Sequence, residues 1–135
     1  MDIGTSDGTR IVNVGSASNL YSLYSTSKVL MGRRAEDVAI ALGFLETGNC
    51  EVANCEKAEV QLARICDELK RHVPGDAVWD IENPNLKAPW VGNLASTVTS
   101  CADLYTTADG ELLLQELLSL LHHAALSGQG VVALG

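Results

Sequence analysis

The chain has 135 residues, of which 47% are hydrophobic and 19% charged, which excludes a disordered protein and predicts a single domain over residues 1–135. Its 17 acidic and 9 basic residues give a formal net charge of −8. This charge argues against nucleic-acid binding, because phosphate contacts require clustered Lys and Arg, and it favours either a basic partner or an acidic surface that serves solubility alone.

The N-terminal third predicts one strand and two helices. Residues 9–15 are rich in β-branched side chains and predict a first strand. Residues 16–19 offer turn and N-cap residues, so we expect a helix from Leu20 to about Arg33, although its serine-rich interior has a weak helix propensity. A second helix is predicted over Ala35–Leu45, and the Thr-Gly-Asn of residues 47–49 ends it.

The clearest amphipathic pattern covers residues 54–72. Its apolar side chains recur at helical spacing, and charged residues lie off the stripe, which predicts a helix with one buried face. Pro74 and Gly75 end this helix. The stripe consists of Ala58, Leu62, Ile65, Cys66 and Leu69.

Alternation over Ala77–Glu82 predicts a strand with Asp80 and Glu82 on one face. The two backbones would lie roughly 7 Å apart, a spacing at which paired carboxylates do acid–base work in glycosidases. Two acidic residues on the outer face of an edge strand are more often solvated or in contact with a partner. We therefore favour an acidic, partner-facing patch over catalysis.

Residues 83–100 are predicted to be a loop, because Pro84 and Pro89 interrupt regular structure and the neighbouring Asn and Gly residues favour turns. Trp90 has two interpretations. It closes the hydrophobic core from the loop side, or it stands exposed as an anchor for a partner, since tryptophan is enriched at interface hot spots.

The C-terminal part predicts a short strand near residues 104–106, a leucine-rich helix over residues 110–127 and a final strand over residues 131–134. Leucines cover most of the helix circumference, so we expect the helix to be buried on more than one side, or to use part of that surface in a homodimer. The sequence thus predicts an α+β fold in which a small sheet of short strands packs against several helices.

No cofactor, metal or membrane association is predicted. The chain has neither a long apolar run nor a secretion signal, so we expect a cytoplasmic protein whose four cysteines are reduced. Cys50 and Cys55 are spaced more widely than in most zinc knuckles. Adjacent His122 and His123 would point about 100° apart on a helix and would not chelate a metal together.

A resemblance to a known family rests on three segments. They are VWDIEN (residues 78–83), APWVGNL (88–94) and TSCADLYTTADGELLLQEL (99–117), preceded by FLETGN at residue 44. Together they resemble the Immunity protein 70 type of bacterial immunity proteins from polymorphic-toxin and contact-dependent growth inhibition systems. The resemblance spans residues 44–117. Asn83 stands where the family pattern has an acidic residue, and Ala88 where it has a proline.

The resemblance implies a protein that is not an enzyme and that binds the C-terminal toxin domain of its own or a sibling cell. Many such toxins are basic nucleases, which an acidic inhibitor complements. The residues expected to contact the toxin are Asp76, Asp80, Glu82, Asn83 and Trp90. Two alternatives remain, a dimeric regulatory or scaffold domain and a small acid–base enzyme.

Overall fold

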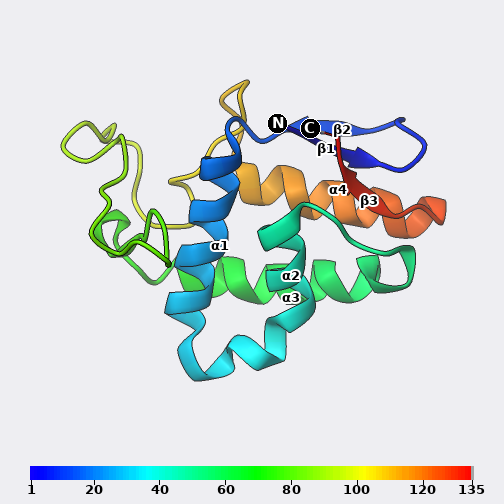
Figure 1. The fold of residues 1–135 in the computed structure, drawn as a ribbon, viewed down its shortest axis with the longest axis horizontal. Helices are drawn as coiled ribbons and strands as arrows, with labels where there is room; N and C mark the ends of the chain where they lie inside the picture. The colour runs from blue at the N-terminus through cyan, green and yellow to red at the C-terminus, as the bar shows by residue number, and fades with distance from the viewer. Residues whose placement is uncertain (135) are drawn as a thin grey trace.

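The sheet joins the two ends of the chain. The computed structural model describes residues 1–134 and contains the strands β1 (Asp2–Thr5), β2 (Ile11–Asn13) and β3 (Val131–Ala133). They form an antiparallel sheet in the order β2-β1-β3, so the N-terminal strand is central and the C-terminal strand lies beside it (Figure 1). The predicted first strand is confirmed as β2, whereas β1 was not predicted.

Gly4 explains why β1 has a weak sequence signal. Glycine is unfavourable in a strand and has no side chain to show alternation. It is required here because a Cβ at Gly4 would lie 2.8 Å from the carbonyl oxygen of Arg10, next to β2. The close approach of the two backbones therefore requires glycine at this position, and glycine weakens the sequence signal of β1.

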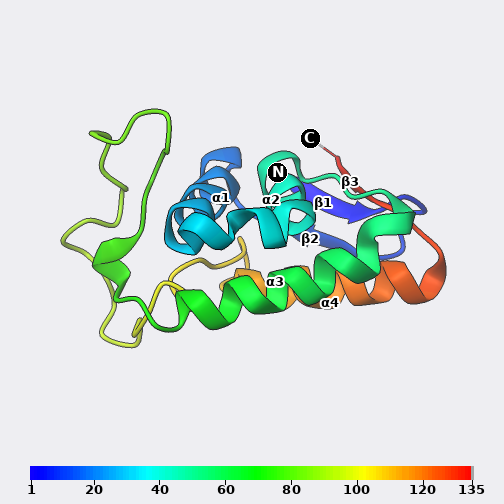
Figure 2. The same ribbon diagram turned by 90° about the horizontal axis from the view of Figure 1, so that it is seen from below.

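The helices form the bulk of the molecule. The helices α3 and α4 run side by side, α1 and α2 lie across them, and α4 also packs against the strands (Figures 1 and 2). The helical elements are α1 (Ala17–Met31), the 3-10 helix η1 (Gly32–Val38), α2 (Ala39–Thr47), η2 (Val52–Asn54), α3 (Cys55–Leu69), η3 (Pro74–Asp76) and α4 (Leu113–Ser127). The predicted α+β fold class is confirmed.

The predicted helices are confirmed with modest shifts at their ends. Ser16 caps α1, because its side-chain oxygen accepts the N–H of Asn19 at 3.1 Å. The second predicted helix begins instead as η1 and becomes α-helical only at Ala39. Gly48 ends α2 in the left-handed conformation, with φ of +79°.

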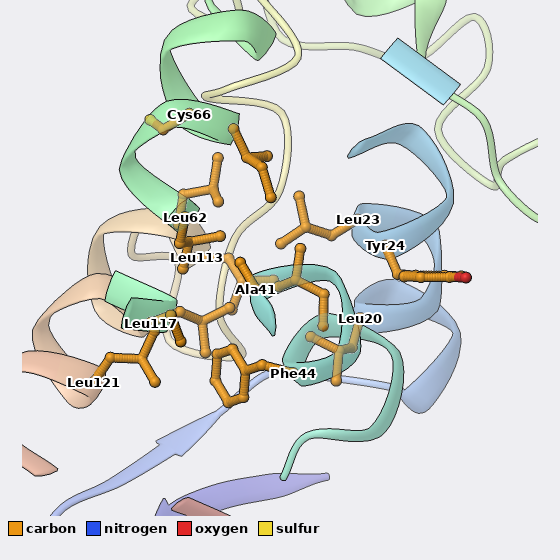
Figure 3. Packing of buried hydrophobic residues seen from close by; sticks show 14 of the residues in the cluster. Leu20, Leu23, Tyr24, Ala41, Phe44, Leu62, Cys66, Leu113, Leu117 and Leu121 are labelled. Atoms are coloured by element: carbon orange, nitrogen blue, oxygen red, sulfur yellow. The ribbon is translucent and has the colours of Figure 1, made fainter. Parts of the chain in front are cut away.

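The core lies where the four α-helices meet. The whole predicted stripe of α3 is buried, and the leucines of α4 fill the space beside it. Each fully buried leucine contributes about 1.5–3 kcal/mol through removal of apolar surface from water. Figure 3 labels ten residues of the buried hydrophobic core: Leu20, Leu23, Tyr24, Ala41, Phe44, Leu62, Cys66, Leu113, Leu117 and Leu121.

The strand predicted over Ala77–Glu82 is wrong, because this segment is irregular and pairs with no other strand among residues 1–134. Side chains of α1 take the place of a neighbouring strand. The N–H of Val78 donates to Thr26 Oγ1 at 2.8 Å, and the carbonyl of Val78 accepts the hydroxyl of Ser22 at 2.8 Å. The N–H of Ile81 donates to Ser25 Oγ at 3.1 Å.

The strand predicted near residues 104–106 is also wrong. Only one isolated bridge, between Thr106 and Leu112, remains of it within the described chain. Tyr105 instead points its side chain into the core, where 1% of its surface is exposed. The backbone turns back between Thr107 and Glu111, and α4 begins at Leu113, so the pairing ends after this one bridge.

Candidate functional site

Residues 74–100, which we name the tryptophan loop, project from the helical body (Figures 1 and 2). Within this fully described stretch, the single short turn η3 is the one helical or strand element. Loops of this length without secondary structure are uncommon in compact domains and are usually either functional or linker segments. The tryptophan loop also contains both tryptophans of the chain and all five residues expected to contact a partner.

An aromatic series ties the tryptophan loop to the core. The rings of Trp79 and Trp90 meet edge to face with centroids 5.1 Å apart, and Trp90 meets Tyr105 in the same way at 5.7 Å. Edge-to-face pairs contribute about 0.5–1.5 kcal/mol beyond their buried area. Trp90 is thus half-buried and packs against the core, as the core-closing interpretation predicts.

Tyr105 connects this series to α1. Its hydroxyl lies 2.7 Å from Thr26 Oγ1 and 2.9 Å from Ser22 Oγ, which are the same hydroxyls that bind the backbone of Val78. Burial raises the pKa of Tyr105 to about 12, so the phenol stays neutral and can donate. The serines and the threonine that lower the helix propensity of α1 therefore hold the tryptophan loop in place.

The two tryptophans line an open pocket of about 400 Å³ in the tryptophan loop. Apolar side chains dominate its walls, and three of them expose much of their surface: Leu86 (55%), Val91 (55%) and Leu94 (41%). Large apolar side chains grouped at one place on a surface are typical of a binding site. Trp90 remains in this candidate site as part of a wall rather than as a projecting side chain.

Asp80, Glu82 and Asn83 come together in one tight turn. Asp80 Oδ1 accepts the N–H of Glu82 at 2.9 Å, and the carbonyl of Asp80 accepts the N–H of Asn83 at 3.1 Å. The predicted shared strand face is therefore replaced by a turn, which still places both carboxylates at the surface. Burial, followed by the negative charges of Glu82 and Asp80, raises the pKa of the Tyr21 hydroxyl of α1.

Asp76 belongs to a different set of contacts. Its Oδ2 lies 3.2 Å from His72 Nδ1, and His72 Nε2 lies 2.8 Å from Glu68 Oε2. Glu68 is buried, with 8% of its surface exposed, and it also forms ion pairs with Arg34 and Arg71. The structure therefore brings three of the predicted partner residues into one turn and places Asp76 in a network that joins α3, η1 and η3.

Sequence reasoning did not single out Glu68 or His72. Hydrogen bonding to Arg34 and then to His72 lowers the pKa of Glu68, and hydrogen bonding to Glu68 raises the pKa of His72. The helical spacing could have indicated that Glu68 is buried, since it follows Ile65 by three positions and therefore borders the buried stripe. Such an acidic residue needs a basic partner, which Arg34 supplies from η1.

The described residues suggest no metal centre or activated thiol. Within residues 1–134, no group of three or more His, Cys, Asp or Glu side chains is placed to hold a metal ion. All four cysteines are buried and free, and burial raises the pKa of Cys50 to about 12 and that of Cys101 to about 11. Thiols with such values stay protonated near neutral pH and are poor nucleophiles. None of the helices in the described part of the chain is long and apolar enough to cross a membrane.

A comparison with protein-family models identifies one relationship. The model of the family described as Immunity protein 70 matches residues 6–132, which extends well beyond the resemblance at residues 44–117 and includes β2 and α1. Searches of the curated proteins and of the solved structures return no match. Because the family model covers nearly the whole chain, this protein belongs to the Immunity protein 70 family.

Proposed function

We propose that this protein is an immunity protein that binds the C-terminal domain of a cognate toxin and neutralises it by forming a stoichiometric complex, without catalysis. The family match over residues 6–132 carries this proposal. Such a complex would protect the producing cell from its own toxin or a sibling's, in a contact-dependent inhibition or related polymorphic-toxin system, and would form in the cytoplasm.

The toxin domain is proposed to be a basic nuclease. The net charge of −8 supports this, because an acidic inhibitor attracts a basic enzyme at long range and competes with nucleic acid for its binding groove. The tryptophan loop contains three acidic residues and one lysine, a net charge of −2, and it protrudes from the body where a partner can reach it.

The interface is proposed to include Asp76, Asp80, Glu82, Asn83 and Trp90. Among residues 1–134, neither Asp80 nor Glu82 forms an ion pair with a lysine or arginine. Their charge is thus available to an external basic group. Asp76 shares its charge with His72 and is expected to contribute less.

The deciding experiment is a growth-rescue test. The toxin domain encoded beside this gene is induced in cells with and without this protein, and the two proteins are then co-purified. We expect restored growth and a stable complex of fixed stoichiometry. If both proteins are folded and yet neither rescue nor a complex is observed, the proposal is wrong and the dimeric-scaffold interpretation is favoured instead.

A further inference from the structure

We propose that the pocket of the tryptophan loop receives an apolar side chain from a basic segment of the toxin domain, and that this contact is the energetic centre of the complex. The inference rests on the proposed function and deepens it, because it states the chemistry of the partner segment. It also changes the expected role of Trp90, which would form a wall of the receiving pocket.

The tryptophan side of the pocket is held before any partner arrives. The hydrogen bonds of Val78 to Ser22 and Thr26 fix the backbone beside Trp79, and the ring of Trp90 rests edge to face between Trp79 and Tyr105. Walls that are already ordered lose little conformational entropy when a partner binds. A loop without secondary structure can therefore still present a preformed site.

The composition of the pocket selects an apolar occupant. Of the residues that line it, all described by the structure, Lys87 is the one charged side chain. Leu86, Val91 and Leu94 stand partly in solvent around the half-buried tryptophans. A volume of about 400 Å³ is at the small end of the range of about 300–1,000 Å³ for ligand sites, so it suits one or two side chains.

Charge decides between a toxin segment and a second copy of this chain. A second copy docked loop to loop would bring its own tryptophan loop, with a net charge of −2 from three acidic residues and one lysine, against the same acidic turn. Like charges would then meet, which is unfavourable. Asp80 directly follows Trp79 of the pocket wall, and Glu82 precedes Pro84 of the wall by two positions. An apolar side chain flanked by Lys or Arg would therefore fill the pocket and bring basic groups toward these two carboxylates.

The test compares two double variants of matched composition. Leu86→Ser with Val91→Ser removes two pocket side chains that are each 55% exposed, whereas Leu126→Ser with Val29→Ser removes the same two residue types at exposed positions of α4 (76%) and α1 (46%). Binding of the purified toxin domain is measured by calorimetry, after circular dichroism has verified that each variant is folded. We expect a loss of affinity of about tenfold or more for the pocket variant, whereas the matched variant should bind like wild type.

A second variant and a second readout guard against an indirect effect. Ala88→Phe adds an aromatic ring to the pocket wall and keeps it apolar, so it should also block binding. Both tryptophans of the chain line this pocket, so acrylamide quenching of their fluorescence should fall when the toxin domain binds to the wild-type protein.

The outcomes separate this inference from the proposed function. If wild type binds the toxin domain and both pocket variants bind it equally well, the pocket inference is overturned while the immunity function stands. If folded wild type does not bind the toxin domain at all, both are overturned. Weakened binding of both pocket variants, with an unaffected matched control, supports the inference.

Discussion

Thr26, in the buried interior of α1, accepts the backbone N–H of Val78 at 2.8 Å and also lies 2.7 Å from the hydroxyl of Tyr105. One side chain thus connects a helix, the tryptophan loop and the segment before α4. Removing the Thr26 hydroxyl should therefore weaken the contacts among these three parts of the structure.

We expect Thr26→Val to destabilise the protein by about 1–3 kcal/mol. The substitution conserves shape but leaves the N–H of Val78 without its acceptor, and burying an unpaired polar group carries a penalty of that size. Urea unfolding monitored by circular dichroism measures the change. Ser18→Ala, at an exposed position of the same helix, should change stability by less than about 0.5 kcal/mol. Equal effects of the two variants would contradict the assigned role of Thr26.

Trp90→Leu should lower stability by about 1–3 kcal/mol, because it removes two edge-to-face ring contacts and keeps an apolar side chain in place. The emission of the remaining Trp79 should shift to longer wavelength as its ring becomes more exposed. Thermal unfolding and fluorescence spectra measure the two effects. An unchanged spectrum and melting temperature would mean that the aromatic series does not hold the tryptophan loop.

The stabilising effect of His72 should depend on pH. Its pKa is higher in the folded protein than its unfolded value of 6.5, chiefly because of the hydrogen bond to Glu68. The contribution of His72 to stability is therefore fully present below about pH 6.5 and is lost as pH rises through the folded pKa. We expect His72→Gln to destabilise the protein more at about pH 5.5 than at about pH 8.5.

Glu68 sets the lower limit of the pH range in which its contact with His72 stabilises the protein. Its pKa is lower in the folded protein than 4.5, so its contribution is present above that value and is lost as pH falls through the folded pKa. Urea unfolding at both pH values measures the effect of His72→Gln. His123→Gln is the control, since His123 lies beside Ser127 and contacts no acidic side chain within residues 1–134, and the effect of His72→Gln is compared with its effect at each pH. A pH-independent effect of His72→Gln would refute the network.

Reversing the charges of Asp80 and Glu82 to lysine should weaken toxin binding by about tenfold or more and leave the fold intact, because both side chains lie in a surface turn. The loss should arise largely from slower association and should shrink at high salt. Surface plasmon resonance at two salt concentrations measures both rates. Glu36→Lys with Asp37→Lys makes the same charge change at exposed positions of η1 and should have a much smaller effect. An unchanged dissociation constant for the Asp80 and Glu82 variant would remove these residues from the interface.

The elements whose burial follows one local period can be predicted from the sequence alone. The stripe of α3 and the leucines of α4 lie at helical spacing, so each helix could be predicted, with its buried face, without knowing its neighbours. Membership of the family was likewise readable from short segments, because their residue order is a local property of the chain.

The contacts that hold the tryptophan loop in place depend on the tertiary fold. Alternation over residues 77–82 favours a strand, but a strand also needs a partner ladder, and the hydroxyls of α1 satisfy this backbone from 52 residues away. The same holds for Glu68, whose burial depends on Arg34 from another element. Backbone polar groups and buried charges take whichever partner the fold brings within hydrogen-bonding distance, and that choice is not encoded in any local pattern.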